Sequence, residues 1–501
     1  MMERFRFAPS PTGPLHIGGL RTALFNYLFA KNTKGEVILR IEDTDKNRYV
    51  EGSEKHIIES LKWLNINFDE GPGIGGKYGP YRQSERIDLY KTYIEELIYK
   101  EKAYYAFDTN EDLMNERRKE EEKGSTFFYG QHNRLSLKNS LSLKSSEVSN
   151  LIENKTPYVI RLLVSTDKNV LCNDMLRGNI NFDSTVLEDK ILLKSDGAPT
   201  YHFANVVDDH LMNISTVVRG EEWLSSLPIH YLIYAAFDWT TPNFLHLPLI
   251  LNPKGKGKLS KRDGDRYGFP VFAINWNENL SQNNGFKEAG FAPISLLNYL
   301  TQLGGSFKNH EGIHSFNDFI DAFDIKKISK GGSKFDYEKA KWINSKYIQN
   351  VDVKDLLSII NSETKRKLES LYPDKINYIY KLVKNRMVLL NDDEKILSFL
   401  ITTPTNYSLE VYRKIKLENA IEVMTSAVEI INKVSVSSFK NSLMLYVKER
   451  GVKLGSLLRS IRFALVGNLT GPDLFDIIKL LDKKECIKRL NNYIEYLKNL
   501  S

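Results

Sequence analysis

The sequence has very little cysteine and no long apolar run. Its 501 residues include two cysteines, Cys172 and Cys486, which lie far apart and form no CxxC pair. This spacing excludes a disulfide framework and does not match a cysteine zinc site. No run reaches the roughly 18 apolar residues that a membrane span needs. Residues 1–7 alternate charged with apolar side chains, unlike a signal peptide. We therefore expect a cytoplasmic protein with no membrane partner.

The rest of the composition is typical of a folded protein with several domains. Hydrophobic residues make up 42% of the chain and aromatic residues 11%, which favours a globular protein over a disordered one. A chain of 501 residues is too long for one core, so we expect three or more domains. The formal net charge of +7 is compatible with a nucleic-acid partner, although lysine is common along the whole chain.

The chain opens with the pattern of a strand, a helix and a second strand. Residues 4–8 predict a short strand, and the Pro- and Gly-rich segment 9–14 breaks both helix and strand. Apolar spacing predicts a helix over 18–31, and the apolar run 37–41 predicts a strand buried in a parallel sheet. This order predicts an α/β fold with a Rossmann-like, doubly wound parallel sheet, whose ligands bind at the carboxyl ends of the strands.

The character of the sequence then changes twice. Helical and serine-rich segments follow residue 87, and the sheet pattern resumes at Thr216-Val217-Val218-Arg219-Gly220. After about Asp336 the periodicity is helical throughout, which predicts all-α domains. The predicted domains are 1–86 and 201–241 (the two halves of the α/β domain), 87–200 (an insertion), 242–335 (a region with a lysine-rich loop), and 336–395 and 396–501 (helical domains).

Two short segments carry the clearest chemistry. The first, FAPSPTGPLHIGG over 7–19, places His16 at the start of the predicted helix, where free backbone N–H groups can bind phosphate. The second, KLSKR over 258–262, is a basic loop flanked by glycines, as suits a mobile loop that closes on a ligand. Taken alone, His16 also fits a solvated helix cap, and KLSKR also fits a solvated basic loop.

A third group lies on the first two strands. Arg6 is on the first strand, and Arg40-Ile41-Glu42-Asp43-Thr44-Asp45 ends the second. A buried arginine must find a carboxylate, or its desolvation is costly. Either a substrate carboxylate binds Arg6 in bidentate geometry, or Arg6 forms an internal Arg–Glu pair with a neighbouring strand. Both possibilities are open at this point.

In this order, the two segments resemble the HIGH and KMSKS signatures of class I aminoacyl-tRNA synthetases. The surrounding sequence resembles bacterial-type glutamyl-tRNA synthetases, most densely over 4–86 and 158–262, and more thinly in the helical third. Gly19 departs from the first signature, because it stands where the second histidine would be. We therefore assign the phosphate role to His16 alone.

The resemblance implies a role for individual residues and regions. The insertion would receive the acceptor end of tRNA, region 242–335 would contact its stem, and the last helical domain would bind the anticodon. The implied residues are His16, Lys258 and Lys261 for catalysis; these three with Gly18, Ser260 and Arg262 for ATP; Arg6, Ser10, Glu42, Tyr201, Asn205 and Arg219 for glutamate; and Arg161, Asp174, Arg177, Arg386, Arg462, Pro472 and Leu474 for tRNA.

The same resemblance implies the reaction. ATP with Mg²⁺ would activate L-glutamate to glutamyl-adenylate, and the glutamyl group would pass to the 3′-terminal adenosine of tRNA(Glu). We expect no zinc, because segment 104–107 lacks the cysteines of the zinc knuckle that some relatives carry in this insertion. We expect a monomer, because no sustained heptad or exposed apolar stripe is visible.

Three other patterns are weaker. Residues 71–76 match G-x-G-x-x-G, but Pro72 lies inside the match and no helix follows, which predicts a glycine loop and no dinucleotide site. The histidines and aspartates within 202–210 do not have the spacing of a zinc motif. The charged run 117–123 predicts a solvated helix face with i,i+4 pairs.

Rival functions make different demands on the sequence. A glutaminyl-tRNA synthetase would need to recognise a neutral amide where Arg6 lies. A truncated relative that glutamylates a tRNA base would lack the helical third. A catalytically inactive RNA-binding regulator should have lost His16 or Lys261, and both are present. A small nucleotidylyltransferase would not need 501 residues.

Overall fold

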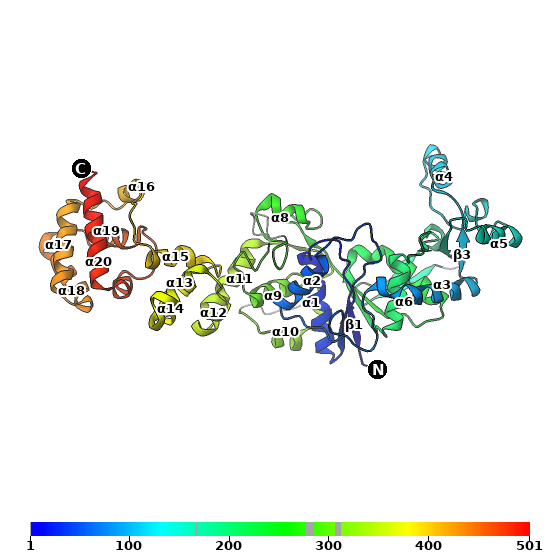
Figure 1. Ribbon diagram of the computed structural model, residues 1–501, viewed down its shortest axis with the longest axis horizontal. Helices are drawn as coiled ribbons and strands as arrows, with labels where there is room; N and C mark the ends of the chain where they lie inside the picture. Colours follow the sequence, from blue (N-terminus) through cyan, green and yellow to red (C-terminus); the bar gives the residue numbers. More distant parts are fainter. Residues whose placement is uncertain (1, 166–168, 277–284, 306–311, 501) are drawn as a thin grey trace. The chain divides into compact units, whose positions relative to one another are not determined.

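The computed structural model describes residues 2–165, 169–276, 285–305 and 312–500. The chain divides into two compact units, one of residues 1–288 and 293–340, and one of residues 289–292 and 341–501. Within the described residues, no helix has both the length and the apolar character needed to cross a membrane. Each unit is described separately below, and Figure 1 labels its elements.

The first unit is built on a sheet of four parallel strands in the order β2-β1-β8-β9. Its strands are β1 (Arg4–Phe7), β2 (Glu36–Leu39), β8 (Thr216–Gly220) and β9 (Asn243–Leu247). The predicted parallel sheet is confirmed. The predicted strand 37–41 extends two residues beyond β2, where Arg40 N–H still donates to the Phe7 carbonyl oxygen and Ile41 forms an isolated bridge with Arg82.

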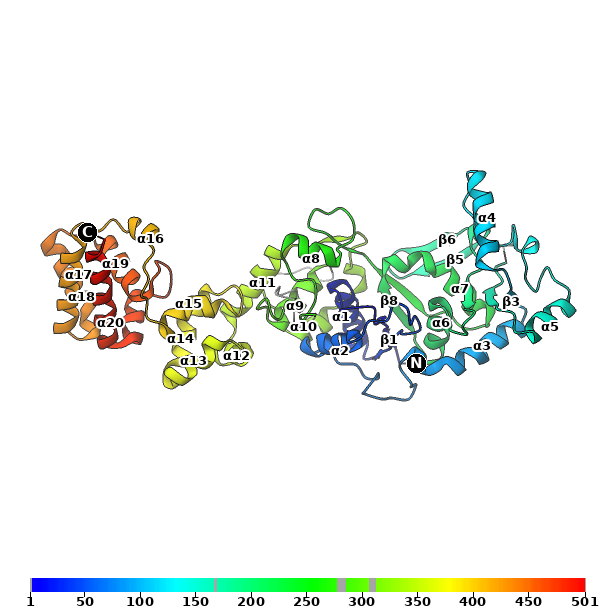
Figure 2. The ribbon, with the colours of Figure 1, turned by 45° about the horizontal axis from the view of Figure 1, so that its top comes forward.

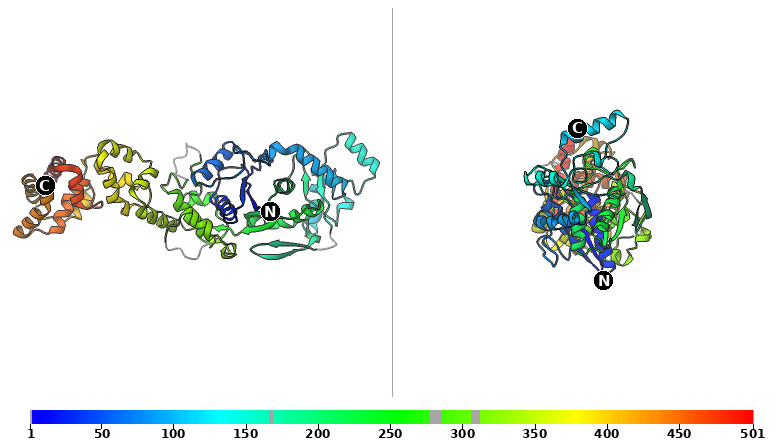
Figure 3. Two further views of the ribbon diagram at one scale, coloured as in Figure 1. Left: turned by 90° about the horizontal axis from the view of Figure 1, so that it is seen from below. Right: turned by 90° about the vertical axis from the view of Figure 1, so that its right-hand side faces the viewer.

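Helices cover both faces of this sheet, as Figures 1 to 3 show from different sides. Alternate side chains of a strand point to opposite faces. On one face, Phe5 packs against Phe29 of α1 (Ile17–Asn32), with ring centroids 4.8 Å apart. On the other face, Val217 and Phe244 share a core with α6 (Tyr201–Leu211) and α7 (Leu227–Ala236). Arg6 points to this second face, where α6 supplies its partner.

The segment between α3 (Ile87–Tyr99) and α6 has its own small sheets. Strands β3 (Ala103–Ala106), β4 (Val159–Leu162) and β7 (Ile191–Leu193) form an antiparallel sheet, and β5 (Val170–Asp174) pairs with β6 (Gly178–Phe182). The helices α4 (Asn110–Glu122) and α5 (Ser145–Glu153) complete it. The charged run lies on α4, but its ion pairs, Lys119–Glu116 and Lys123–Glu120, are spaced i,i+3, not i,i+4 as predicted.

The first unit also contains shorter elements. Helix α2 (Ser53–Trp63) precedes the insertion. The elements after β9 are β10 (Ile250–Leu251), α8 (Lys261–Tyr267), α9 (Pro293–Gln302), α10 (Phe316–Ala322) and β11 (Ser333–Lys334), which pairs with β10. Residues 71–76 form a turn closed by a Gly71–Gly75 bridge, which confirms the predicted glycine loop. The KLSKR segment is a loop only in part, because Ser260 caps α8 and Lys261 begins it.

The second unit is helical, as predicted. Its helices are α11 (Tyr337–Asn350, which begins in the first unit), α12 (Val353–Ile359), α13 (Glu363–Leu371), α14 (Ile376–Val383), α15 (Asp392–Ile401), α16 (Leu409–Arg413), α17 (Ala420–Lys433), α18 (Val436–Arg450), α19 (Leu454–Val466) and α20 (Leu474–Lys498). The finer domain boundaries expected from the sequence stay predictions.

Candidate active site

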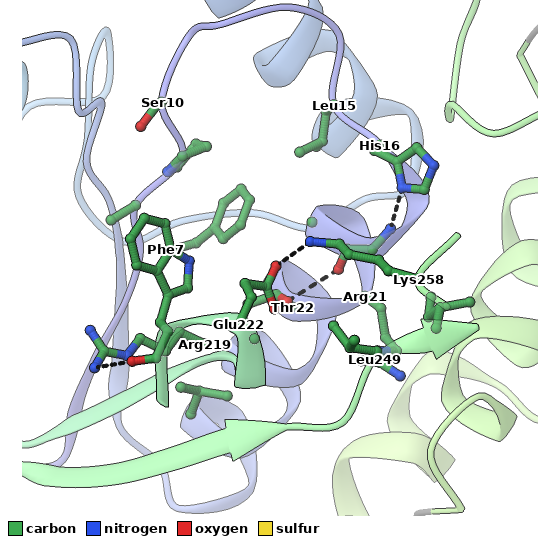
Figure 4. A pocket seen from close by; sticks show the side chains of 18 of the residues that line it. Phe7, Ser10, Leu15, His16, Arg21, Thr22, Arg219, Glu222, Leu249 and Lys258 are labelled. Atoms are coloured by element: carbon green, nitrogen blue, oxygen red, sulfur yellow. Dashed lines mark hydrogen bonds and ion pairs between the residues drawn. The ribbon is translucent and has the colours of Figure 1, made fainter. Parts of the chain in front are cut away.

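A cavity of about 490 Å³ opens where the strands of the parallel sheet end (Figure 4). Its walls come from β1 and the loop after it, the starts of α1 and α6, the end of β8, the segment that follows β9, and the KLSKR segment. Every residue predicted to bind glutamate or ATP lines this cavity except Arg262, which is exposed on α8. The structure thus gathers residues that are up to about 250 positions apart in sequence, as expected for the carboxyl end of a parallel sheet.

His16 begins α1 and faces the cavity. Its Nδ1 accepts a hydrogen bond from the backbone N–H of Gly18 at 3.2 Å, so its Nε2 carries the ring proton. That Nε2 is buried and has no hydrogen-bond partner among the described residues. Burial lowers the pKa of His16 to about 4, and the ammonium groups of Lys258 and Lys261 contribute to the shift. His16 is therefore a neutral hydrogen-bond donor at neutral pH, with its proton available to a ligand.

The two lysines of the KLSKR segment differ in their contacts. Lys258 Nζ pairs with Glu222 Oε1 at 2.6 Å, which Figure 4 shows as a dashed line. Lys261 has no carboxylate partner in the described part of the chain, and partial burial lowers its pKa. Its Nζ lies 2.8 Å from where a Cβ would stand on Gly13, whose φ is +130°. A side chain at position 13 would therefore displace this ammonium group.

Arg6 has an internal partner, and the partner is not on a neighbouring strand. Its Nε donates to both carboxylate oxygens of Asp209 on α6, at 3.0 and 3.2 Å. Asp209 also receives Arg40 at 2.8 Å, and the two guanidinium groups hold the pKa of this carboxyl below its usual range against the opposing effect of its burial. Glu42 receives Arg40 at 3.1 Å and the amide of Asn205 at 2.7 Å. The alternative of an internal pair is therefore correct in kind, with Asp209 in place of a glutamate.

Arg219 is a buried arginine that forms no ion pair within the described residues. It is 5% exposed, and its Nε donates to His246 Nε2 at 2.9 Å. Its terminal nitrogens lie 3.3 Å from the Tyr201 hydroxyl and 3.3 Å from the Trp223 carbonyl oxygen. Burial lowers the pKa of Arg219, yet an arginine stays charged in proteins. Its charge is therefore available to an acidic ligand.

The buried charges at the inner end of the cavity are paired unevenly. Arg6, Arg40 and Arg86 form direct ion pairs with the carboxylates of Glu42, Asp208 and Asp209. Arg219 forms no direct ion pair within the described residues, and the buried carboxylate of Asp174 reaches it only through the ring of His246. An acidic ligand would give Arg219 the ion pair that it lacks, since an unpaired charge in a dry site is costly.

Several lining or supporting residues have no signal in the sequence. Arg21 on α1 lines the cavity and donates to the backbone carbonyls of Pro248 and Leu303. Glu222 and Trp223 line the cavity from the short helix after β8. These residues match no motif, and only the apolar periodicity of α1, which places position 21 on a buried turn, points to one of them.

The residues of the insertion that are predicted to bind tRNA face different environments. Arg161 is 3% exposed, donates to the Asp189 carbonyl oxygen at 2.9 Å and lies over the Tyr129 ring. Asp174 is 1% exposed and accepts from His246. Both side chains are buried and held by internal contacts, and their expected contact with tRNA stays a prediction. Arg177 is partly exposed and pairs with Glu221.

The four residues of the second unit that are predicted to bind tRNA lie together. Burial lowers the pKa of half-buried Arg462, and the exposed Arg386 is near enough to contribute to this shift. Arg462 NH1 donates to the carbonyl oxygen of Pro472 at 2.6 Å. The side chains of Pro472 and Leu474 are buried, so that the arginines, and not these two, offer surface to a partner.

The histidines and aspartates within 202–210 form no metal cluster in the described ranges. Asp208 receives Arg86 at 2.7 Å and the Tyr90 hydroxyl at 2.8 Å, and Asp209 is bound by two arginines. His210 stacks on the Trp239 ring. These contacts account for the side chains without a metal ion, and the expected absence of zinc stays a prediction.

Comparison with known proteins identifies the family. A family model described as tRNA synthetases class I (E and Q), catalytic domain, matches residues 3–342, and an anticodon binding domain matches residues 344–494. The glutamate–tRNA ligase of Christiangramia forsetii is 45% identical over 99% of both chains. That of Porphyromonas gingivalis is 44% identical over 99% of this chain and 98% of its own.

A solved structure agrees with these relatives. The crystal structure of a glutamate tRNA ligase from Elizabethkingia meningosepticum, in complex with its amino acid, superposes with a TM-score of 0.93. It is 42% identical and is matched over 99% of both chains. The two domain matches, the relatives and this structure agree over nearly the whole chain. The chain therefore belongs to the class I tRNA synthetases and, within them, to the glutamate–tRNA ligases.

Proposed function

We propose that the cavity binds glutamate at its inner end and MgATP at its outer end, and that it joins them as glutamyl-adenylate. The observation that carries this proposal is the buried, uncompensated charge of Arg219 in the same cavity as the unpartnered Nε2 of His16. The first group recognises a carboxylate, and the second recognises a phosphate oxygen.

Glutamate has two carboxylates and one ammonium group, and the inner end offers a partner for each kind. Arg219 takes the side-chain carboxylate, with Arg6 lining the same wall. Glu42 is buried, lines the cavity and takes the α-ammonium group, and Asn205 and Arg40 hold it in place. Tyr201 and Ser10 line the remaining wall. The α-carboxylate is then free to attack ATP.

ATP occupies the outer end. The α-carboxylate attacks the α-phosphate in line, an acyl–phosphate bond forms, and pyrophosphate leaves with the electrons of the broken P–O bond. His16 Nε2–H and the Lys261 ammonium group donate to phosphate oxygens and stabilise the charge that develops there. Lys258 joins them when its pair with Glu222 opens. Mg²⁺ enters with ATP as part of the substrate, held mainly by phosphate oxygens and water.

The second step is acyl transfer to tRNA. The 2′-hydroxyl of the terminal adenosine of tRNA(Glu) attacks the carbonyl carbon of the adenylate, and AMP leaves. We assign the acceptor end to the insertion and the anticodon to the second unit, where Arg386 and Arg462 offer donors to splayed bases. A cytoplasmic location and a monomeric state stay predictions.

Glutamate-dependent ATP–pyrophosphate exchange, measured with and without tRNA, tests the proposal. Exchange should require glutamate, and glutamine at the same concentration should not replace it, because an amide leaves the charge of Arg219 uncompensated. Arg266→Ala is a matched control, since this exposed cation lies on α8 but outside the cavity. Exchange that glutamine supports equally, or that Arg266→Ala lowers as much as Lys261→Ala does, would contradict the proposal.

A further inference from the structure

Two buried histidines lie behind Arg219 and outside the cavity. His246 is 0% exposed on β9, and His230 is 1% exposed on α7. Both contact the Arg219 guanidinium, and neither lines the cavity. The parallel register places Arg219 directly beside His246 on the neighbouring strand, so that their side chains share one face of the sheet.

The proton positions of His246 follow from its two contacts. Arg219 Nε always carries a proton, and so His246 Nε2, at 2.9 Å, must be the acceptor. The proton of His246 then lies on Nδ1, which donates to Asp174 Oδ2 at 2.8 Å. Asp174 is fixed in turn, because the backbone N–H groups of His246, Leu176 and Arg177 donate to its oxygens at 2.8 to 3.0 Å.

His230 completes the arrangement with the opposite ring orientation. Its Nδ1 lies 3.4 Å from Arg219 NH1 and must accept, which leaves the proton on its Nε2. That Nε2 is 3.2 Å from Nδ1 of His202, which accepts. Both histidines are therefore neutral acceptors toward Arg219. A carboxylate at either place would also orient the guanidinium, but it would neutralise its charge.

We infer that His246, oriented by Asp174, is the main positioning residue for glutamate recognition, with His230 as a weaker second. Together they fix the Arg219 guanidinium through neutral acceptors and leave its positive charge for the side-chain carboxylate of the substrate. The contact to His246, at 2.9 Å, is shorter than that to His230, at 3.4 Å, whereas the 3.3 Å contacts of the terminal nitrogens to Tyr201 and Trp223 can be exchanged for a ligand. This inference rests on the proposed function and adds the groups that prepare its glutamate site.

The two ring orientations give a test with its own controls. Asparagine places its polar atoms near the Nδ1 position of a histidine, and glutamine places them near the Nε2 position. At position 246 the contact is made by Nε2, so H246Q retains an acceptor for Arg219 and H246N does not. At position 230 the contact is made by Nδ1, and so the order reverses, with H230N as the conservative variant and H230Q as the disruptive one.

The assay is aminoacylation at saturating tRNA, with KM measured separately for glutamate and for ATP. H246N should raise the glutamate KM roughly tenfold, as expected for one lost hydrogen bond to a charged group. H246Q should recover most of that loss, the ATP KM should stay within about twofold in both, and saturating glutamate should restore kcat. At position 230, H230Q should raise the glutamate KM more than H230N does, and by less than H246N. Exposed His132→Asn is the control for a histidine-to-asparagine change.

The outcomes separate the possible failures. Equal glutamate KM values for the asparagine and glutamine variants at position 246, or glutamate and ATP KM values that rise together, would overturn the inference. If the variants at position 246 do not fold, the glutamate KM values of H230N and H230Q test the inference in the same way. Failure of the proposed function would appear differently, as an unaltered protein that does not charge tRNA with glutamate.

Discussion

Replacing Arg219 and replacing Arg6 should have different consequences, although both are buried arginines in one cavity. Arg219 has no carboxylate partner among the described residues, whereas Arg6 shares Asp209 with Arg40. Removing Arg219 therefore leaves no carboxylate without its partner. Removing Arg6 leaves Asp209, which is 2% exposed, with one guanidinium group in place of two. We expect Arg219→Gln to affect substrate binding, and Arg6→Ala to affect stability as well.

The magnitudes follow from the burial of the two sites. Truncating one partner of a buried, hydrogen-bonded charge pair costs about 2–5 kcal/mol. For Arg219→Gln this cost appears in the glutamate complex, and kcat/KM for glutamate should fall by roughly 30-fold to a few thousandfold, at about 1.4 kcal/mol per factor of ten. For Arg6→Ala, breaking a buried pair should lower the free energy of unfolding by about 3 kcal/mol. Arg219→Gln should lower it less, because it removes an uncompensated buried charge.

Two measurements check this contrast on the same preparations. Aminoacylation at saturating tRNA gives KM and kcat for glutamate and ATP, and thermal unfolding of the unliganded proteins gives their stability order. Arg219→Gln should raise the glutamate KM alone, and its thermal midpoint should lie above that of Arg6→Ala. If Arg219→Gln damaged both substrates equally, or destabilised the protein at least as much as Arg6→Ala, the charge assignment at this site would be wrong.

Three further predictions concern Lys261, His16 and the arginines of the second unit. Lys261→Ala should slow adenylate formation on the order of 10²-fold, with a smaller effect on transfer from preformed adenylate, and single-turnover assays should separate the two steps; equal slowing would remove the phosphate role. His16 should titrate with a pKa of about 4 in the free protein, and bound ATP should raise this pKa. Because the folded-state pKa lies below the ordinary value of 6.5, the contribution of His16 to stability is lost as pH falls from about 6.5 through 4. Ring-proton NMR, assigned with His16→Gln, measures the pKa of His16 in the free protein and in the ATP complex. A pKa unchanged by ATP would contradict a contact between His16 and the phosphates. Arg386→Ala and Arg462→Ala should each weaken tRNA binding by about 1–3 kcal/mol with glutamate and ATP parameters unchanged, and unaltered tRNA kinetics in both would leave the second unit without a tRNA contact.

The sequence predicted the position of the site better than its internal contacts. Helix α1, the parallel strands and the glycine loop at 71–76 follow from periodicity and from Gly and Pro positions, which are local properties of the chain. The gathering of His16 and Lys261 at one end of the sheet followed from the resemblance and from the rule for parallel sheets. The buried contacts of Asp174 with His246 could not be predicted from the sequence, because a matched motif does not say whether a side chain is buried.

The pairing of buried charges shows why this part could not be predicted. The sequence places Arg6 and Arg40 on strands, and it places Asp208 and Asp209 on a helix. Which carboxylate neutralises which arginine depends on how that helix crosses the sheet, and no local pattern encodes the crossing.

The selectivity of the site arises from the same arrangement. Asp209 neutralises Arg6 and Arg40 from one side, and the neutral His246 orients Arg219 from behind, so that Arg219 faces the inner end of the cavity without an ion pair among the described residues. A ligand that supplies the missing negative charge is stabilised there, and one that carries an amide in its place leaves the arginine buried and unpaired. Discrimination between an acid and its amide therefore needs no group that repels the amide, only an arginine for which the described residues provide no carboxylate partner.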